Sequence, residues 1–353
     1  GERNTAVGSA AGDAITTGVR NTTVGFSALS TLTTASYNTA LGAFALSDNT
    51  AANNVALGYY ALAVNSTGTN NTAAGMDSLK ANTTGSSNTA FGNSALGSNT
   101  TADNNTAVGL SALYANTTGS ENTAVGQAAG DAITTGSANT CVGQSSLSAA
   151  TTASNNTAVG TDALTANTSG DTNVAVGKGS MAANTAGTNN TAVGARSLDA
   201  NTTGASNVAV GDNALGAATT ANYNVAVGTD SCLVSTIATQ NVAVGYETLK
   251  ALTEGEGNTA VGMRSMLDHT TGNYNTGIGI QSLYNTTTSS YNSGIGYNSL
   301  LAVTTGSYNV GGSARAGETI VDGDGNICIG YQADTPASNT DRAIVIGMQA
   351  TGV

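Results

Sequence analysis

The sequence predicts an all-β parallel β-solenoid (β-roll) of about 20 coils, and three observations support this fold class. A five-residue motif, typified by Asn105–Gly109, returns along the whole chain. The spacing is 17 residues at every step except one of 16, and so strict a period is typical of a solenoid. The residues between motifs are rich in turn formers. The leading Asn of the motif lies at positions 4, 21, 38, 54, 71, 88, 105, 122, 139, 156, 173, 190, 207, 224, 241, 258, 275, 292, 309 and 326.

We number each coil from this Asn. Position 2 is Thr or Val, position 3 Ala, position 4 an aliphatic residue and position 5 Gly, while positions 8 and 9 are usually Ala-Leu or Ser-Leu and positions 12 to 15 tend to Asn-Thr-Thr-Gly. A 17-residue unit of this composition has neither the length nor the period of an amphipathic helix. Residues 2 to 4 predict a short strand, and we expect a second strand around positions 8 to 11. Each coil would then add one rung to a parallel sheet on each side.

The first strand has two different faces. Positions 2 and 4 should point to one side, and the small residues at positions 3 and 5 to the other, where backbones can approach closely. A Gly at position 5 also permits a restricted turn conformation. Ser313 is the one exception, with Gly at positions 3 and 4 of its coil instead. The Asn residues at positions 1 and 12 should form ladders of hydrogen bonds between successive coils.

Both faces of the first strand lack charge, and a coil this small encloses only one narrow layer of core. Apolar residues on two faces therefore suggest that one face is buried against another chain. Because identical chains usually associate in closed rings, we expect a parallel homotrimer. A monomeric rod and a laterally paired rod are the alternatives.

The repeat changes character toward the C-terminus, so we divide the chain into a regular solenoid at 1–308 and divergent terminal coils of the same solenoid at 309–353. Position 17 is Tyr in three consecutive coils, at Tyr274, Tyr291 and Tyr308. In register, these rings should stack as a ladder, which is our candidate ligand-binding site for sugars. They could instead fill a groove between chains. Tyr residues at position 6 are assigned to turn packing.

A candidate metal site follows in the turn that contains Asp322, Asp324 and Asn326. Alternating side-chain oxygens of this kind can collect a calcium ion, although the full EF-hand pattern is absent. The alternative is an acidic, Gly-rich turn, and no other cofactor is expected.

Four further residues are chemically distinctive. Cys141 and Cys328 replace the Ala of position 3, and Cys232 replaces the Leu of position 9. We expect all three to be buried and too far apart for disulfides within the chain. His269, the single His, is expected to lie in solvent in a turn.

Composition argues against several classes of function. The net charge of −12 and the scarcity of Lys and Arg argue against nucleic acid. One His rules out a multi-His metal site, no nucleophile motif is present, and we expect no enzyme activity. No apolar run is long enough to insert in a membrane, and both ends look cut from a longer protein.

The segment Asn104–Gly109 resembles the Asn-Ser-Val-Ala-Ile-Gly repeat of trimeric autotransporter adhesin heads, and Asn207–Gly211 and Asn241–Gly245 come closer still. The whole chain is also similar to Thr-Gly-Ser-Asn-Asn-Thr-Ala-Val-Gly repeats of tail-fibre-type proteins from phages and bacterial surfaces. These resemblances imply a left-handed, usually trimeric β-roll that serves as an adhesive or receptor-binding fibre.

We therefore expect a rod-like, extracellular fibre segment of a cell surface or virion that presents Thr, Asn and Tyr surfaces to host glycans or proteins. One alternative is a self-assembling extracellular filament or sheath subunit. The other is an ice-binding solenoid, suggested by the abundant Thr.

Overall fold

The computed structural model describes residues 1–352 and confirms a parallel β-solenoid with one strand in each coil. It divides into two compact units, residues 1–173 and 174–353. The first unit contains β1 (Thr5–Val7), β2 (Thr22–Val24), β3 (Thr39–Leu41), β4 (Val55–Leu57), β5 (Thr72–Ala74), β6 (Thr89–Phe91), β7 (Thr106–Val108), β8 (Thr123–Val125), β9 (Thr140–Val142) and β10 (Thr157–Val159). The second contains β11 (Val174–Val176), β12 (Thr191–Val193), β13 (Val208–Val210), β14 (Val225–Val227), β15 (Val242–Val244), β16 (Thr259–Val261), β17 (Thr276–Ile278), β18 (Ser293–Ile295), β19 (Val310–Gly312), β20 (Ile327–Ile329) and β21 (Ile344–Ile346).

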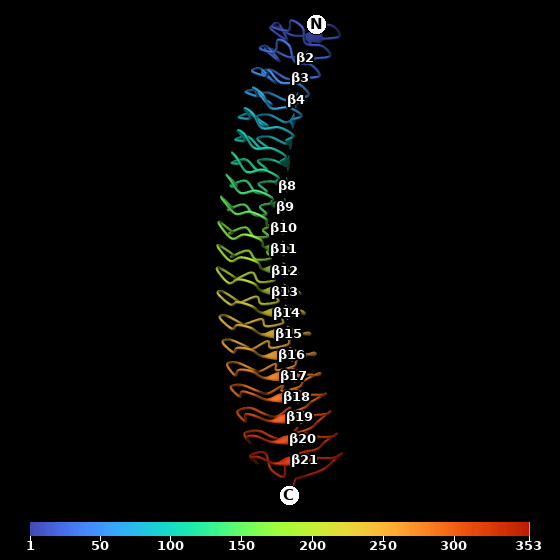
Figure 1. The fold of residues 1–353 in the computed structure, drawn as a ribbon, viewed down its shortest axis with the longest axis vertical. Helices are drawn as coiled ribbons and strands as arrows, with labels where there is room; N and C mark the ends of the chain where they lie inside the picture. The colour runs from blue at the N-terminus through green and yellow to red at the C-terminus, as the bar shows by residue number, and fades with distance from the viewer. Residues whose placement is uncertain (353) are drawn as a thin grey trace. The chain divides into compact units, whose positions relative to one another are not determined.

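Within each unit the strands pair in chain order, parallel and in register. Thr106 pairs with Thr123, for example, and Ala107 with Ala124. The 16-residue coil keeps this register, since Ala40 pairs with Ala56. Figure 1 shows the strands of successive coils following one another in each unit. Residues 1–352 form no helix long and apolar enough to cross a membrane.

The second strand predicted at positions 8 to 11 is wrong. Positions 7 and 9 adopt left-handed backbone angles, with φ of 56° at Ser111 and 51° at Leu113, whereas a strand needs negative φ throughout. The N–H groups still bond between coils: Ser111 donates to Asn93 of the preceding coil and Leu113 to Ala129 of the next, both at 3.0 Å. The chain therefore makes a turn of alternating handedness here instead of a second sheet.

The core of each coil is one narrow layer. Ala107 from the strand and Ala112 and Leu113 from the turn are all fully buried. The strand shows the two faces that its pattern predicts, because position 3 is buried while position 4 is partly or largely exposed in most coils. Cys141, Cys232 and Cys328 take inward positions and are buried and free, as predicted. Burial raises the pKa of the Cys141 thiol to about 12.

Two Asn ladders line this core, as predicted. At position 12, Asn116 Nδ2 donates to Asn99 Oδ1 at 2.9 Å, and Asn99 Nδ2 to Asn82 Oδ1 at 2.8 Å. At position 1 the shorter bond comes from the backbone: Asn88 N–H lies 3.0 Å from Asn71 Oδ1, against 3.2 Å for Nδ2. These bonds between amides satisfy most of the buried polar groups of the thin core, although Asn116 Oδ1 is left without a partner in the described chain.

The Gly at position 5 is required by both conformation and space. Gly211 has φ of 137°, and a Cβ there would lie 2.6 Å from the carbonyl carbon and oxygen of Gly228. Such φ values are nearly restricted to Gly. Ser313, the one other residue at position 5 of the described coils, is not among the residues with positive φ. The pairing of β19 with β20 correspondingly registers only two residue pairs, but β19, β20 and β21 continue the parallel ladder.

We predict that Gly211→Ala destabilises the chain by roughly 3 kcal/mol or more, because the new Cβ meets the next coil at a backbone angle that Ala avoids. Gly216→Ala, in the same coil, is the matched control: its φ is ordinary and the nearest atom to a Cβ is 3.2 Å away. We expect the control to change stability by less than about 1 kcal/mol. Urea unfolding of the two variants checks this, and equal effects would contradict the prediction.

Candidate ligand-binding surfaces

Tyr274, Tyr291 and Tyr308 form the stacked ladder that the sequence predicts. The ring centroids of Tyr274 and Tyr291 are 5.5 Å apart, and those of Tyr291 and Tyr308 are 5.0 Å apart with planes only 4° from parallel. Each residue has a left-handed backbone and donates its N–H to the preceding coil, as Tyr291 does to Asn273 at 3.0 Å. All three side chains remain exposed. The repeat itself therefore positions the rings, one per coil.

Glycines bound this Tyr ladder at both ends. Gly257 and Gly325 occupy the same register position in the adjoining coils. A Cβ on Gly257 would lie 2.6 Å from the ring of Tyr274, so that ring leans over the preceding coil. Tyr308 is the most exposed of the three, at 62% against 48% for Tyr274. The Tyr ladder thus presents a strip of ring edges and hydroxyls, with a more open ring at the Tyr308 end.

The predicted calcium residues have different surroundings. Asn326 is fully buried in the position-1 ladder: its Oδ1 accepts from Ala343 N–H at 2.9 Å and its Nδ2 donates to Asn309 Oδ1 at 3.0 Å. Asp324 Oδ1 accepts from Ser307 N–H at 2.7 Å, and Asp322 lies in the neighbouring turn. Asn326 is therefore already committed to the coil stack. Within residues 1–352 no three His, Cys, Asp or Glu side chains are grouped as a metal site would require.

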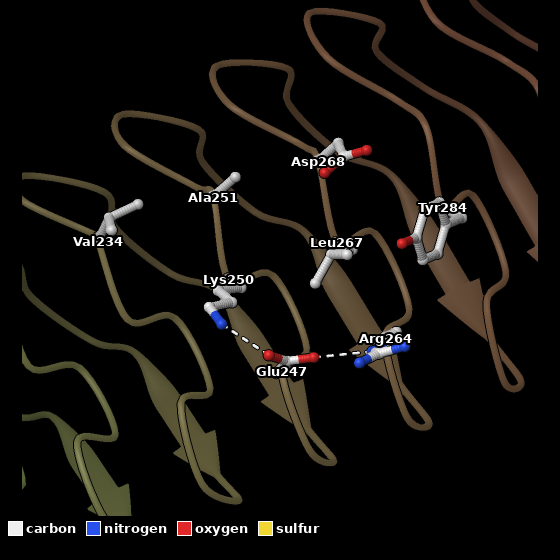
Figure 2. A pocket seen from close by; sticks show the side chains of 8 residues that line it. All are labelled: Val234, Glu247, Lys250, Ala251, Arg264, Leu267, Asp268 and Tyr284. Carbon is white, nitrogen blue, oxygen red and sulfur yellow. Dashed lines mark hydrogen bonds and ion pairs between the residues drawn. The ribbon is translucent and has the colours of Figure 1, made fainter.

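A groove of about 480 Å³ lies in the second unit, on residues at positions 7, 10 and 11 of successive coils. Val234, Ala251 and Leu267 supply its apolar lining. Figure 2 shows Leu267 between Arg264 and Asp268, with the hydroxyl of Tyr284 pointing back toward it. The sequence did not predict this groove. The only signal for it is that larger and charged residues replace the usual small ones at these positions in consecutive coils.

A charged network forms one wall of the groove. Glu247, with a side chain only 12% exposed, accepts from Lys250 Nζ at 2.6 Å and from Arg264 Nε at 2.7 Å. These hydrogen bonds, first from Lys250 and then from Arg264, hold the pKa of Glu247 below its usual range. Arg264 also lies over the ring of Tyr246, 5.9 Å from its centroid. The wall is therefore held in place before any ligand arrives.

His269 is buried, so the expectation that it lies in solvent is wrong. It occupies position 12, where coils such as that of Asn82 carry Asn, and its Nε2 lies 2.9 Å from the carbonyl oxygen of Gly272. Asn82 makes the same bond to Gly85 at 2.9 Å. Because a carbonyl only accepts, Nε2 carries the proton, and Nδ1 is left buried without a partner in the described chain. Burial lowers the pKa of the His269 imidazole.

The first unit holds an aromatic cluster that was not predicted from the sequence. Phe26 and Tyr59 at position 6 meet Phe44 and Tyr60 at position 7, and Phe44 stacks on Tyr60 with centroids 4.8 Å apart. Phe26 and Tyr59 remain about half exposed. The sequence signal for this cluster is the pair of aromatic residues at position 7 of consecutive coils. Positions 6 and 7 have to be considered together to see it.

Comparison with family models, curated proteins and solved structures found no match to this chain.

We predict that His269→Asn removes an acid sensitivity from the fold. The folded-state pKa of His269 lies below its unfolded value of about 6.5, so as pH falls through that value the unfolded chain binds the proton first. The free energy of unfolding that depends on neutral His269 is therefore fully present above pH 6.5. It falls below pH 6.5, by at most about 1.4 kcal/mol per pH unit. Unfolding free energies of both chains between pH 7.5 and 5 check this. A difference between them that does not vary with pH would contradict it.

Proposed function

We propose that this chain is a structural and adhesive fibre segment, displayed outside the cell on a cell surface or a virion. The observation that carries the proposal is the exposed Tyr ladder of Tyr274, Tyr291 and Tyr308, built on a repetitive surface of low charge. Tyr combines a large apolar ring with a hydroxyl, which suits contact with glycans and proteins alike. Attachment to host glycans or proteins needs no catalytic group.

The division of labour within each coil supports this proposal. Inward side chains at positions 1, 3 and 9 hold one coil to the next, as Asn105 and Leu113 do, and they vary little along the chain. Outward positions 6, 7, 14 and 17 vary freely, because a change there leaves the ladders intact. A scaffold of this kind can present different contact surfaces without refolding.

Self-association into a parallel homotrimer is part of the proposal. Aliphatic side chains occupy position 4 in nearly every coil, on the outward face of the strand, and Leu41 and Ile295 are 50% and 52% exposed. Recurrent exposed aliphatic groups on one face are typical of a surface that another chain covers. A second and third copy in the same orientation would present complementary repeats at the same spacing.

The filament alternative shares this self-association but lacks a closed ring. The ice-binding alternative has less support, because the Thr hydroxyls at position 13 are used within the coil stack: Thr117 Oγ1 donates to Thr134 O at 3.0 Å. The Thr rows at position 14 and at position 2 of the strand, such as Thr123, then remain for ordering water.

We predict that the triple variant Tyr274→Ala, Tyr291→Ala, Tyr308→Ala loses at least about tenfold in attachment to host cells, matrix or immobilised glycans, since about 1.4 kcal/mol of ring contact is removed. Tyr223→Ala is the matched control, because Tyr223 has the same register position and backbone conformation and is 64% exposed, outside the Tyr ladder. Binding measured by surface plasmon resonance separates the two. Equal binding by all chains would overturn the role of the Tyr ladder.

We predict a solution mass of three times 34.3 kDa, about 103 kDa, by light scattering. Ile278→Lys with Ile295→Lys should convert this trimer to monomer at little cost in folding, because both side chains are exposed and new charges would face each other between chains. Thr288→Lys, at an exposed position outside this face, should leave the trimer intact. A wild-type monomer would contradict the trimer, and open-ended filaments would favour the assembly subunit.

A further inference from the structure

The groove in the second unit combines an apolar floor with polar groups on several sides. Leu267 lies at its centre, Arg264 and Asp268 flank it, and Tyr284 approaches from the next coil (Figure 2). Its volume of about 480 Å³ lies within the range of about 300–1,000 Å³ that is common for small-molecule sites. A ligand here must offer an apolar surface and a rim of hydrogen-bonding groups together.

The groove offers both hydrogen-bond donors and acceptors, and the main donor, Arg264, is already held in position. Arg264 bonds Glu247 through Nε, which leaves both Nη groups as donors. Asp268 is exposed and offers carboxylate oxygens as acceptors, and the Tyr284 hydroxyl can do either. Because Glu247 and the ring of Tyr246 already hold the guanidinium of Arg264, a ligand loses less free energy in ordering it.

The charge of the groove selects the class of ligand. Two acids, Glu247 and Asp268, balance two bases, Lys250 and Arg264, so the lining carries no net charge. Lys250 is further engaged by Asp230, whose carboxylate lies 3.9 Å away. With Asp230 counted, the groove has no excess of positive charge, which nucleic acid and acidic polymers would need. An uncharged ligand with donors and acceptors around an apolar face therefore matches the groove.

We propose that this groove binds an uncharged oligosaccharide, with the apolar face of one sugar ring on Leu267 and beside Tyr284, and its hydroxyls bonded to Arg264 Nη and to the Asp268 carboxylate. Sugar hydroxyls both donate and accept, as the mixed rim requires, and the C–H face of a pyranose suits the floor. The inference does not rest on the adhesive role, because the groove lies at register positions 7, 10 and 11 and shares no residue with the Tyr ladder at position 17.

The test is binding of the full chain to an array of neutral and acidic oligosaccharides, followed by calorimetry with the best neutral one. We expect the wild type to bind at least one neutral oligosaccharide, and Asp268→Asn and Tyr284→Ala each to weaken that binding at least tenfold. Asp268→Asn keeps the shape of an exposed side chain, so its effect does not depend on a loss of folding.

Two controls separate this site from other surfaces. Arg264→Gln should weaken binding, whereas Arg315→Gln should not, although Arg315 has the same register position and bonds Glu318 through Nε at the same 2.7 Å. The triple Tyr-ladder variant should bind the neutral oligosaccharide as the wild type does. The inference is overturned if no neutral oligosaccharide binds, if only acidic ones bind, or if Asp268→Asn and Tyr284→Ala leave binding unchanged.

Discussion

Hydrogen bonds that cross from one coil to the next are the constraint on which the rest of the structure depends. A 17-residue coil encloses too little apolar volume to be stable alone, so each coil must satisfy its polar groups in its neighbours. The strands do this in register, and the alternating turn does it as well, with Ser111 bonding backward and Leu113 forward. Any residue that prevents the close approach of two coils therefore disturbs more than its own position.

This constraint explains why the interior and the surface follow different rules. Inward positions 1, 3 and 9 accept few residue types, whereas position 12 varies, and there His269 imitates Asn by bonding the same carbonyl that Asn82 uses in its own coil. That imitation is incomplete, since one ring nitrogen is left buried without a partner. Outward positions carry no such demand, and both the Tyr ladder and the groove around Leu267 are found there.

The repeat also determines how such surfaces are built. Residues at one register position in successive coils become direct neighbours, which produces the Tyr ladder. Residues at different register positions meet across coils, which produces the groove around Leu267 and the aromatic cluster around Phe44. The first kind of surface is linear and repetitive, whereas the second kind collects unlike groups around one point. Only the second kind can surround a single ligand with an apolar floor and a polar rim.

The sequence by itself determined the fold class, the one strand at positions 2 to 4, the Asn ladders and the stacking of Tyr274 on Tyr291, because all of these follow from a fixed 17-residue period that places like residues side by side. Only the tertiary structure decided that positions 8 to 11 form a turn, since Ser and Leu have no intrinsic preference for the left-handed angles that they adopt at 111 and 113. It also decided the burial of His269 and the groove around Leu267. Those features depend on contacts between unlike positions of neighbouring coils, and a period along the chain carries no information about them.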